Sequence, residues 1–317
     1  MMSLDQFDQD PLFGLVGNTP LLPLSRTTGH LPEGVRISAK IERNNPGGSV
    51  KDRAALRMIR QGLAEGRLRE GLTILDSTSG NTGIALAWIG ARLGMPVHLI
   101  MPANVSEERK RIIGAFGATV TLTDPMEGSD GAMRVADEMY HRDPNRFFKP
   151  DQYHNPENPM AHTDTTAQEI WQQSQGTVTH FVAALGTSGT AMGTTRGLKG
   201  IAPAIQCFGA MPSEPFHGIE GLKHMPSSIN PTIYHPSELD GIVEVGTEAA
   251  YRMAQRLARE EGILVGQSSG CALAAALELA RRVEPGQTAH IVTVFPDGGE
   301  KYLTTRMWES LGGGDGI

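Results

Sequence analysis

Apolar residues along the chain gather in short runs that alternate with amphipathic segments. The runs are rich in β-branched residues, a pattern that predicts buried strands. Strands are predicted over residues 35–42, 72–77, 96–102, 118–123, 179–186, 204–211 and 289–295. The sequence therefore predicts a protein with β-sheets, whose strands alternate with amphipathic segments along the chain.

The segments between these runs carry apolar residues three and four positions apart, as a helix with one buried face does. Helices are predicted over residues 50–64, 81–93, 106–115, 127–140, from about 190, 247–261 and 270–282, with Thr247 as an N-cap. Strand–helix alternation favours parallel sheets that helices cover on both faces. There are too many units for one small sheet, so we predict an α/β protein of two domains, with a changeover near residue 150.

Composition narrows the classes of function. The chain has 317 residues and a net charge of −7, which argues against a nucleic-acid partner. Its two cysteines, Cys207 and Cys271, lie outside any Cys-x-x-Cys or Cys/His pattern, so we expect neither a disulfide framework nor a metal site. Arg92, Pro96 and His98 interrupt the longest apolar run, which argues against a membrane helix. The first ten residues are acidic and lack an apolar core, so a cytoplasmic location is expected.

Two loops that follow predicted strands have the composition of anion-binding loops. DSTSGNTG, residues 76–83, gathers hydroxyls and an amide around Gly80 where a helix begins, although a well-capped turn would look the same. LGTSGTAMG, residues 185–193, combines Gly186 and Gly189 with three hydroxyls. It lacks the dinucleotide and triphosphate fingerprints, so it suits a monophosphate, with a plain glycine-rich turn as the alternative.

Lys51 stands in an unusual setting. NNPGGSVKDRAAL, residues 44–56, places it after a Pro-Gly turn and in the first turn of a predicted helix. The positive end of the helix dipole disfavours an ammonium group there, which biases the lysine toward its neutral, nucleophilic form. Near a phosphate-binding loop, such a lysine suggests a Schiff base with pyridoxal phosphate. The alternative is a surface lysine that pairs with Asp52.

Taken in order, five motifs resemble the cysteine synthase (O-acetylserine sulfhydrylase) family of fold-type II pyridoxal-phosphate enzymes, most closely its B-type branch. The motifs are NNPGGSVKDRAA, TSGNTG, DQYHNPENP, THFVAALGTSGT and EEGILVGQSSG. The resemblance implies a tryptophan synthase β-like α/β fold of two domains, each with a twisted, mostly parallel sheet flanked by helices. Residues 45–155 would form the smaller domain, and residues 1–44 with 156–317 the larger one.

The resemblance also implies roles for single residues. Lys51 would form the Schiff base with the cofactor and then remove the substrate's α-proton. The cofactor would further contact Asn81 at its 3-hydroxyl, Gly186, Thr187, Ser188, Gly189 and Thr190 at its phosphate, and Ser268 at its pyridine nitrogen. The substrate carboxylate would be bound by Thr78, Ser79, Gly80, Thr82 and Gln152. These are neutral donors, so we expect no fixed positive charge near the Schiff base.

The implied reaction is a β-replacement. O-acetylserine would lose its β-substituent, and the resulting aminoacrylate would add sulfide or thiosulfate to give L-cysteine. Two departures from the family pattern leave the acceptor open. Residues 216–236 replace a GIGxGFIP-like segment, and Lys223 within them is either a ligand for a leaving phosphate or a solvent-exposed lysine. The alanine at position 167 resembles the pattern of cystathionine β-synthases, where many cysteine synthases have glycine. The alternatives are therefore an O-phosphoserine sulfhydrylase or a cystathionine β-synthase-like enzyme that uses serine.

Two further expectations follow from the resemblance, and the residues also argue against two other classes of function. Asp297, in PDGGEK, is expected behind the cofactor near Ser268. The family is typically dimeric, so we expect a homodimer whose other partners are small molecules, with no nucleic acid or membrane. A dinucleotide-dependent oxidoreductase would need a fingerprint that the chain lacks. A binding protein that had lost the chemistry would be expected to lack at least one of the cofactor residues.

Overall fold

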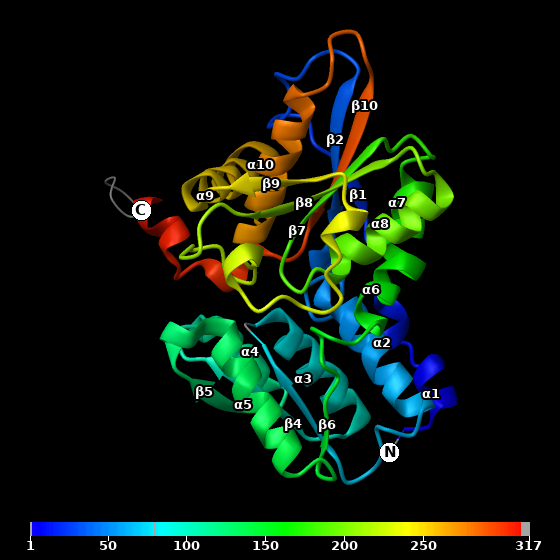
Figure 1. Cartoon of the computed structure of the whole chain (residues 1–317), viewed down its shortest axis with the longest axis vertical. Helices are drawn as coiled ribbons and strands as arrows, with labels where there is room; N and C mark the ends of the chain where they lie inside the picture. Colours follow the sequence, from blue (N-terminus) through cyan, green and yellow to red (C-terminus); the bar gives the residue numbers. More distant parts are fainter. Residues whose placement is uncertain (1, 79, 312–317) are drawn as a thin grey trace.

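Two sheets organise the computed structural model, which describes residues 2–78 and 80–311 (Figure 1). The larger sheet has the strand order β1-β2-β10-β7-β8-β9, in which β1 alone is antiparallel to its neighbour. Its strands are β1 (Leu21–Pro23), β2 (Val35–Ile41), β10 (Ala289–Phe295), β7 (His180–Ala184), β8 (Gln206–Pro212) and β9 (Gly241–Val245). The smaller sheet is parallel, with the order β5-β4-β3-β6. Its strands are β5 (Thr119–Thr123), β4 (Val97–Pro102), β3 (Thr73–Ser77) and β6 (Phe147–Phe148).

Helices alternate with the strands along the chain. They are α1 (Leu4–Asp8), α2 (Lys51–Ala64), α3 (Asn81–Leu93), α4 (Glu107–Ala115), α5 (Gly128–Arg142), α6 (Glu157–Ala161), α7 (Ala167–Gln173), α8 (Gly189–Ile201), α9 (Thr247–Arg256) and α10 (Gln267–Arg281). Residues His162–Thr166 and Leu257–Glu261 form π-helical turns beside α7 and α9. In the described part of the chain, no helix has the length and apolar character that crossing a bilayer requires.

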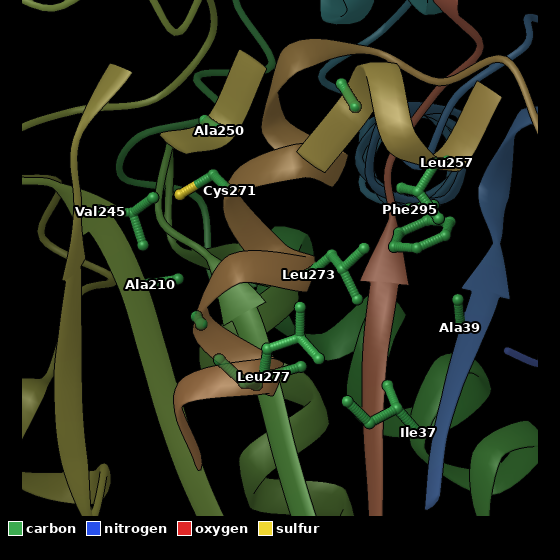
Figure 2. Close-up of a cluster of buried hydrophobic side chains, with 14 of the residues drawn as sticks. Ile37, Ala39, Ala210, Val245, Ala250, Leu257, Cys271, Leu273, Leu277 and Phe295 are labelled. Carbon is green, nitrogen blue, oxygen red and sulfur yellow. The ribbon is translucent and has the colours of Figure 1, made fainter. Parts of the chain in front are cut away.

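The larger sheet has a hydrophobic core on each face. On one face α9 and α10 pack against the strands, and Leu273 and Leu277 of α10 meet Ile37 of β2 and Phe295 of β10 (Figure 2). On the other face α7 and α8 cover β7 and β8 through a second cluster. In the smaller sheet, α3 contributes Trp88 and its neighbours to one face while α5 covers the other. Strands that helices cover on both faces carry apolar residues at consecutive positions, which explains the short apolar runs in the sequence.

The predicted fold class is confirmed, whereas several local elements differ. The short strands β1, β6 and β9 and the helices α6 and α7 have no counterpart among the predicted elements. The prediction of Thr247 as an N-cap is wrong, because Gly246 occupies that position. Thr247 is the first helical residue, and its Oγ1 accepts a hydrogen bond from the N–H of Gly218 at 3.1 Å. The hydroxyl thus serves a distant loop instead of its own helix.

Candidate active site

A cavity of about 580 Å³ opens where strands of both sheets end. Its wall includes Thr78, which follows β3, Pro102 at the end of β4, Gly186, which follows β7, and Pro296, which follows β10. Parallel α/β sheets commonly bind ligands beyond the carboxyl ends of their strands. Most of the described site residues that the sequence predicted line this cavity: Lys51, Thr78, Asn81, Thr82, Gln152, Gly186, Thr187, Thr190, Lys223 and Ser268. Gly80, Ser188 and Gly189 are not among its lining residues, although each is a chain neighbour of one that is.

Lys51 is the first residue of α2 and faces this cavity. The turn before it is anchored to the end of β10, because the N–H of Val50 donates to the carbonyl of Pro296 at 2.8 Å. Burial lowers the pKa of Lys51, while the carboxylates of Asp297 and Glu42 act in the opposite direction. The direction agrees with the sequence argument, although burial is the main cause where that argument relied on the helix end. A lysine of lowered pKa can act as a nucleophile and base.

The turn after Lys51 is fixed by buried charges. Asp52 is fully buried and accepts hydrogen bonds from the N–H of Gly47 and from Nε1 of Trp88 at 3.1 Å. It therefore does not serve Lys51 as the surface partner that the alternative interpretation required. Arg53 donates to Glu42 at 2.7 Å and to Glu169 at 2.6 Å, which ties α2 to the segment after β2 and to α7. These contacts hold the start of α2, and so Lys51, in one place.

Residues 76–83, which we call the carboxylate loop after its predicted ligand, join β3 to α3. The Oγ1 atom of Thr78 accepts hydrogen bonds from the N–H groups of Gly80 at 2.9 Å and Gly83 at 3.1 Å. Gly80 has φ +149°, which only glycine adopts without strain. Thr82 Oγ1 donates to Gln152 Oε1 at 2.6 Å, and Gln152 Nε2 donates to the carbonyl of Ser77. Ser79 lies outside the described residues, so its predicted role stays a prediction.

Asn81 opens α3 and is held from two sides. Its Nδ2 donates to Asp297 Oδ2 at 2.8 Å, and its Oδ1 accepts from Lys301 Nζ at 3.2 Å. Asp297 Oδ2 also accepts from the hydroxyl of Tyr302 at 2.7 Å. Asp297 is fully buried, and its Oδ1 has no hydrogen-bond partner among the described residues. The structure thus connects Asp297 directly to Asn81, a contact that the sequence did not indicate.

Residues 185–190, which we call the phosphate loop, join β7 to α8 and approach other backbone closely. A Cβ on Gly186 would collide with the carbonyl oxygen of Gly221, and one on Gly189 would collide with the side chain of Asn158. Ser188 takes a left-handed conformation with φ +70°. Its buried Oγ finds no partner within residues 2–78 and 80–311. An unsatisfied buried hydroxyl in a tight glycine loop at a helix start suits a phosphate oxygen.

Neutral groups from the segment around α6 support the phosphate loop. Asn158 Nδ2 donates to Thr187 Oγ1 at 3.1 Å. His162 Nε2 lies 3.3 Å from Thr190 Oγ1, and its Nδ1 lies 2.9 Å from Thr166 Oγ1. Burial lowers the pKa of His162 to about 3, so the ring is neutral at ordinary pH. Neither contact could be predicted from the sequence, because Asn158 and His162 lie far from the phosphate loop along the chain.

Lys223 is not the solvent-exposed lysine of one sequence interpretation. Its side chain is 5% exposed, and its Nζ donates to Asp130 of α5 at 2.6 Å. It also lies over the ring of Tyr153, 5.4 Å from the ring centre. The exposed-lysine interpretation is therefore wrong. Lys223 lines the cavity, but its ammonium group is already paired with the carboxylate of Asp130, which lies on a helix that covers the smaller sheet.

Two residues in the cavity wall were missed by sequence reasoning altogether. Arg109 of α4 is buried and pairs with Glu220 of the segment between β8 and β9. Its guanidinium lies 4.4 Å from the ring centre of Tyr302. A lone arginine within an amphipathic helix resembles any surface arginine in sequence, so no local signal could reveal it. No cluster that could hold a metal ion occurs among the described residues.

The residues present fit pyridoxal phosphate. The unpartnered Ser188 hydroxyl and the tight phosphate loop offer a place for its phosphate. Lys51, with its lowered pKa, lies in the same cavity as Asn81 and Ser268, the latter in the first turn of α10. All three can reach one ligand in that cavity. This donor set matches a flat, phosphorylated aldehyde that a lysine holds covalently.

Comparison with known proteins decides the family. The model of the family described as "Pyridoxal-phosphate dependent enzyme" matches residues 12–297. The chain belongs to this family. Cysteine synthase from Aquifex aeolicus is 54% identical over 302 residues, which cover 95% of this chain and 92% of that protein. Cysteine synthase B from Pseudomonas aeruginosa is 43% identical, with 93% of this chain and 96% of that protein covered.

Solved structures of the family agree with these relatives. The crystal structure of cysteine synthase from Entamoeba histolytica superposes with a TM-score of 0.89 at 36% identity, over 97% of this chain and 92% of that one. The resemblance found in the sequence is therefore confirmed, and so is the fold-type II architecture. As a member of a pyridoxal-phosphate dependent family, the protein is an enzyme that uses this cofactor.

Proposed function

We propose that this enzyme is a cysteine synthase, which replaces the acetoxy group of O-acetylserine with sulfide to form L-cysteine and acetate, or with thiosulfate to form S-sulfocysteine and acetate. The observation that carries the proposal is the convergence of Lys51, Asn81, Ser268 and the phosphate loop on one cavity, in a chain whose relatives are cysteine synthases.

Lys51 binds the cofactor and then takes the proton from the substrate's α-carbon. Its lowered pKa leaves the amine neutral for a larger share of the time, as both tasks require. Pyridoxal phosphate, when bound, draws electrons from the α-carbon and so lets the β-substituent depart. The anchored turn before Lys51 and the buried ion pairs after it keep the amine within reach of that carbon.

The remaining site residues hold and orient the cofactor and the substrate. The phosphate loop, Gly186 with Thr187, Ser188, Gly189 and Thr190, takes the phosphate on its N–H groups and hydroxyls. Asn81 takes the 3-hydroxyl oxygen, and Ser268 faces the pyridine nitrogen. The carboxylate loop, through Thr78, Ser79, Gly80 and Thr82, binds the substrate carboxylate together with Gln152. Once the carboxylate is bound, the cavity keeps water from the reacting carbon atoms.

Lys223 favours acetylserine over phosphoserine in this proposal. A leaving phosphate would need a free cation, whereas Lys223 Nζ is paired with Asp130 at 2.6 Å. To serve phosphoserine, the lysine would have to give up this ion pair, and lysine offers only a point charge to replace it. Acetate is smaller and carries a single charge, so it makes no such demand.

The reaction and its acceptor are tested by the visible absorbance of the purified holoenzyme. O-acetylserine, O-phosphoserine and L-serine are added in separate cuvettes. We expect the cofactor's absorbance to change with O-acetylserine. It should recover when the sulfur donor is added, with release of L-cysteine for sulfide and of S-sulfocysteine for thiosulfate. A response to phosphoserine or serine alone would overturn the assigned acceptor. A protein that binds no cofactor would overturn the function.

We also propose that the enzyme is a cytoplasmic homodimer with its domain boundary where the family resemblance puts it, at residues 45–155. Support for the boundary comes from the smaller sheet, whose strands all lie between Thr73 and Phe148. Light scattering of the purified chain tests the dimer. A monomer at micromolar concentration would contradict it.

A further inference from the structure

Arg109 brings a permanent positive charge up against the carboxylate loop. Its side chain is 2% exposed and packs so closely beneath Gly80 that a Cβ on this glycine would stand 2.6 Å from Nε and nearer still to Cδ. The sequence led us to expect no fixed positive charge near the Schiff base, and this stays a prediction. The wall directly behind the carboxylate loop does carry such a charge.

The hydrogen-bonding needs of Arg109 are incompletely met. A guanidinium has five N–H donors and stays charged in proteins. Here Nη1 pairs with Glu220 and the group lies over Tyr302, whereas Nε has no acceptor among the described residues. Burying a cation is unfavourable unless anions compensate for the lost water. The carboxylate of Asp297 also acts on the charge of Arg109, but it leaves Nε without an acceptor, so the site can still gain from a further negative charge close to Gly80.

Glu220 reaches Arg109 from the opposite side of the cavity. Arg109 belongs to α4, which packs with the smaller sheet, while Glu220 follows β8 of the larger sheet. The N–H of Glu220 donates to Gln267 Oε1 at 2.7 Å, which holds the carboxylate's backbone against α10. Glu220 is 29% exposed, so it offsets the charge of Arg109 only in part. The negative charge of Glu220 repels any other anion that approaches Arg109.

We propose that Arg109 is the positioning residue that gives the carboxylate loop its affinity for the substrate carboxylate, and that Glu220 limits this affinity by pairing with Arg109. The inference rests on the proposed function, because it takes the loop to be the carboxylate site. Arg109 fixes Gly80, and with it the N–H groups at the start of α3, and its charge attracts the carboxylate through a poorly solvated wall. Glu220 weakens that attraction, which favours release of the amino-acid product.

An ordinary structural ion pair would behave differently. If Arg109 and Glu220 only held the two sides of the cavity together, removing either charge would disturb the site in the same direction. In the proposal the two removals have opposite effects on carboxylate binding, since one removes the attraction and the other removes its competitor. The sign of the effect therefore separates the two roles.

The test uses Arg109→Gln and Glu220→Gln holoenzymes. Glycine, which has no β-substituent to lose, is titrated while the cofactor's absorbance is followed, and ethylamine serves as the probe without a carboxylate. We expect Arg109→Gln to weaken glycine binding and Glu220→Gln to tighten it, each by at least about fivefold, the low end of typical coupling between two sites. Ethylamine binding and cofactor content should stay unchanged.

Matched controls come from the same helix. Lys110→Gln and Glu107→Gln remove one charge of each sign from α4, where the two residues pair with each other at 2.7 Å and Glu107 is largely exposed. Neither lines the cavity. Both controls should bind glycine as the wild type does. A change equal to that of the cavity variants would mean that net charge, and not position, sets the affinity, and would overturn the proposal.

Several results would overturn the inference. These are weaker glycine binding in both cavity variants, no change in either, or an equal loss of ethylamine binding. If Arg109→Gln fails to fold, Glu220→Gln decides alone, because only the proposal expects tighter binding there. A wild-type holoenzyme that responds to O-acetylserine while these signs are wrong would refute the inference and leave the proposed function intact. A wild type with no response to O-acetylserine would refute the function itself.

Discussion

The phosphate loop and the carboxylate loop occupy corresponding places in the two sheets, yet they are supported in different ways. Each follows a parallel strand and opens a helix, and each combines glycine with hydroxyl side chains. The phosphate loop rests on neutral groups, the amide of Asn158 and the neutral ring of His162. The carboxylate loop rests on charged groups, because Arg109 lies beneath Gly80, and Asp297 and Lys301 hold Asn81.

This difference matches the two ligands that we assign to the loops. A cofactor stays bound through many turnovers, so rigid neutral packing around its phosphate is sufficient. A substrate must bind and leave in every turnover, and partly compensated charges provide an affinity that a single neighbouring carboxylate can adjust. The comparison therefore predicts that damage to the first loop affects the cofactor, whereas damage to the second affects the amino acid.

The largest effect is expected for Lys51→Ala, which removes the group that both loops serve. Turnover of O-acetylserine should fall by about 10³-fold or more, since positioned acid–base groups contribute about 10²- to 10⁴-fold and covalent attachment is lost as well. Steady-state cysteine formation measures it. Lys199→Ala is the control, because Lys199 pairs with Asp240 outside the cavity. Wild-type turnover in Lys51→Ala would refute the assigned role.

The next effects come from adding one methyl group to each loop. Gly189→Ala would collide with the side chain of Asn158, which is held by its own hydrogen bonds. Overpacking costs about 1–3 kcal/mol, so we expect cofactor affinity to fall by about tenfold. Gly80→Ala should instead keep the cofactor and lose glycine affinity by about tenfold, because φ +149° and Arg109 both oppose a side chain.

Fluorescence titration with pyridoxal phosphate and absorbance titration with glycine measure the two affinities separately. The comparison of the loops predicts that each variant loses one affinity and keeps the other. If both variants lost both affinities to the same extent, the two loops would not bind separate ligands, and the assignment of the cofactor to one loop and the amino acid to the other would be wrong.

An effect of similar size, but on the rate and not on either affinity, is expected for Asp297→Asn. The substitution keeps the shape of the side chain but removes the charge that accepts from Asn81 and Tyr302. Hydrogen bonds to charged groups contribute about 1.5–3 kcal/mol, so a partly misplaced Asn81 should lower kcat by about tenfold and shift the cofactor's absorbance maximum. The cofactor content should remain at the wild-type level. An unchanged spectrum and kcat would remove Asp297 from the site.

The last effect is on stability and not on activity, and it concerns Asp76 at the base of the carboxylate loop. Burial raises the pKa of Asp76 to about 7 from an ordinary value of 3.8, and its Oδ2 has no partner within the described residues. A carboxyl group with a raised folded-state pKa favours folding below pH 3.8 and loses this contribution as pH rises toward 7. The wild type should therefore lose about 2–4 kcal/mol of stability over this range from Asp76, a slope that Asp76→Asn removes.

Urea unfolding of both proteins at pH 4.5 and pH 8 measures this difference. The Asp76→Asn protein should be the more stable of the two at pH 8, and the gap should narrow at pH 4.5. His162→Gln offers the comparison in the other loop. Because the pKa of His162 is lowered to about 3 from an ordinary value of 6.5, the unfolded chain binds a proton at pH 4.5 that the folded ring does not, while at pH 8 neither state binds it. His162→Gln removes this acid-side loss of stability, so relative to the wild type it should be more stable at pH 4.5 than at pH 8, the opposite trend to Asp76→Asn. Equal pH slopes for wild type and Asp76→Asn would contradict the burial argument.

The sequence predicted the fold and the central residues because both depend on local patterns. Runs that are mostly apolar and rich in β-branched residues, such as residues 289–295, mark buried parallel strands, and β10 has the same bounds in the structure. Lys51 and the two loops stand out because glycine, hydroxyl and lysine residues gather within a few positions of one another. Short edge strands escaped prediction: β1 has three residues and β6 two, too few to show any period.

What surrounds the loops could not be predicted, since it comes from distant parts of the chain. Arg109 meets Glu220 across 111 positions, and Asn81 meets Asp297 across 216. Lys223 was open to two interpretations because its partner, Asp130, lies 93 positions away on α5. Charged residues are usually exposed, so burial of this kind is invisible until the tertiary contacts are known.

The measurement that tests the central claim most directly identifies the lysine that holds the cofactor. Holoenzyme is treated with borohydride, which fixes the cofactor to that lysine, and the digested protein is examined by mass spectrometry. Lys223 and Lys301 are also buried near the cavity, so the chain offers real competitors. We predict that the peptide containing Lys51 carries the added pyridoxyl mass. A label on another lysine, or on none, would contradict the account.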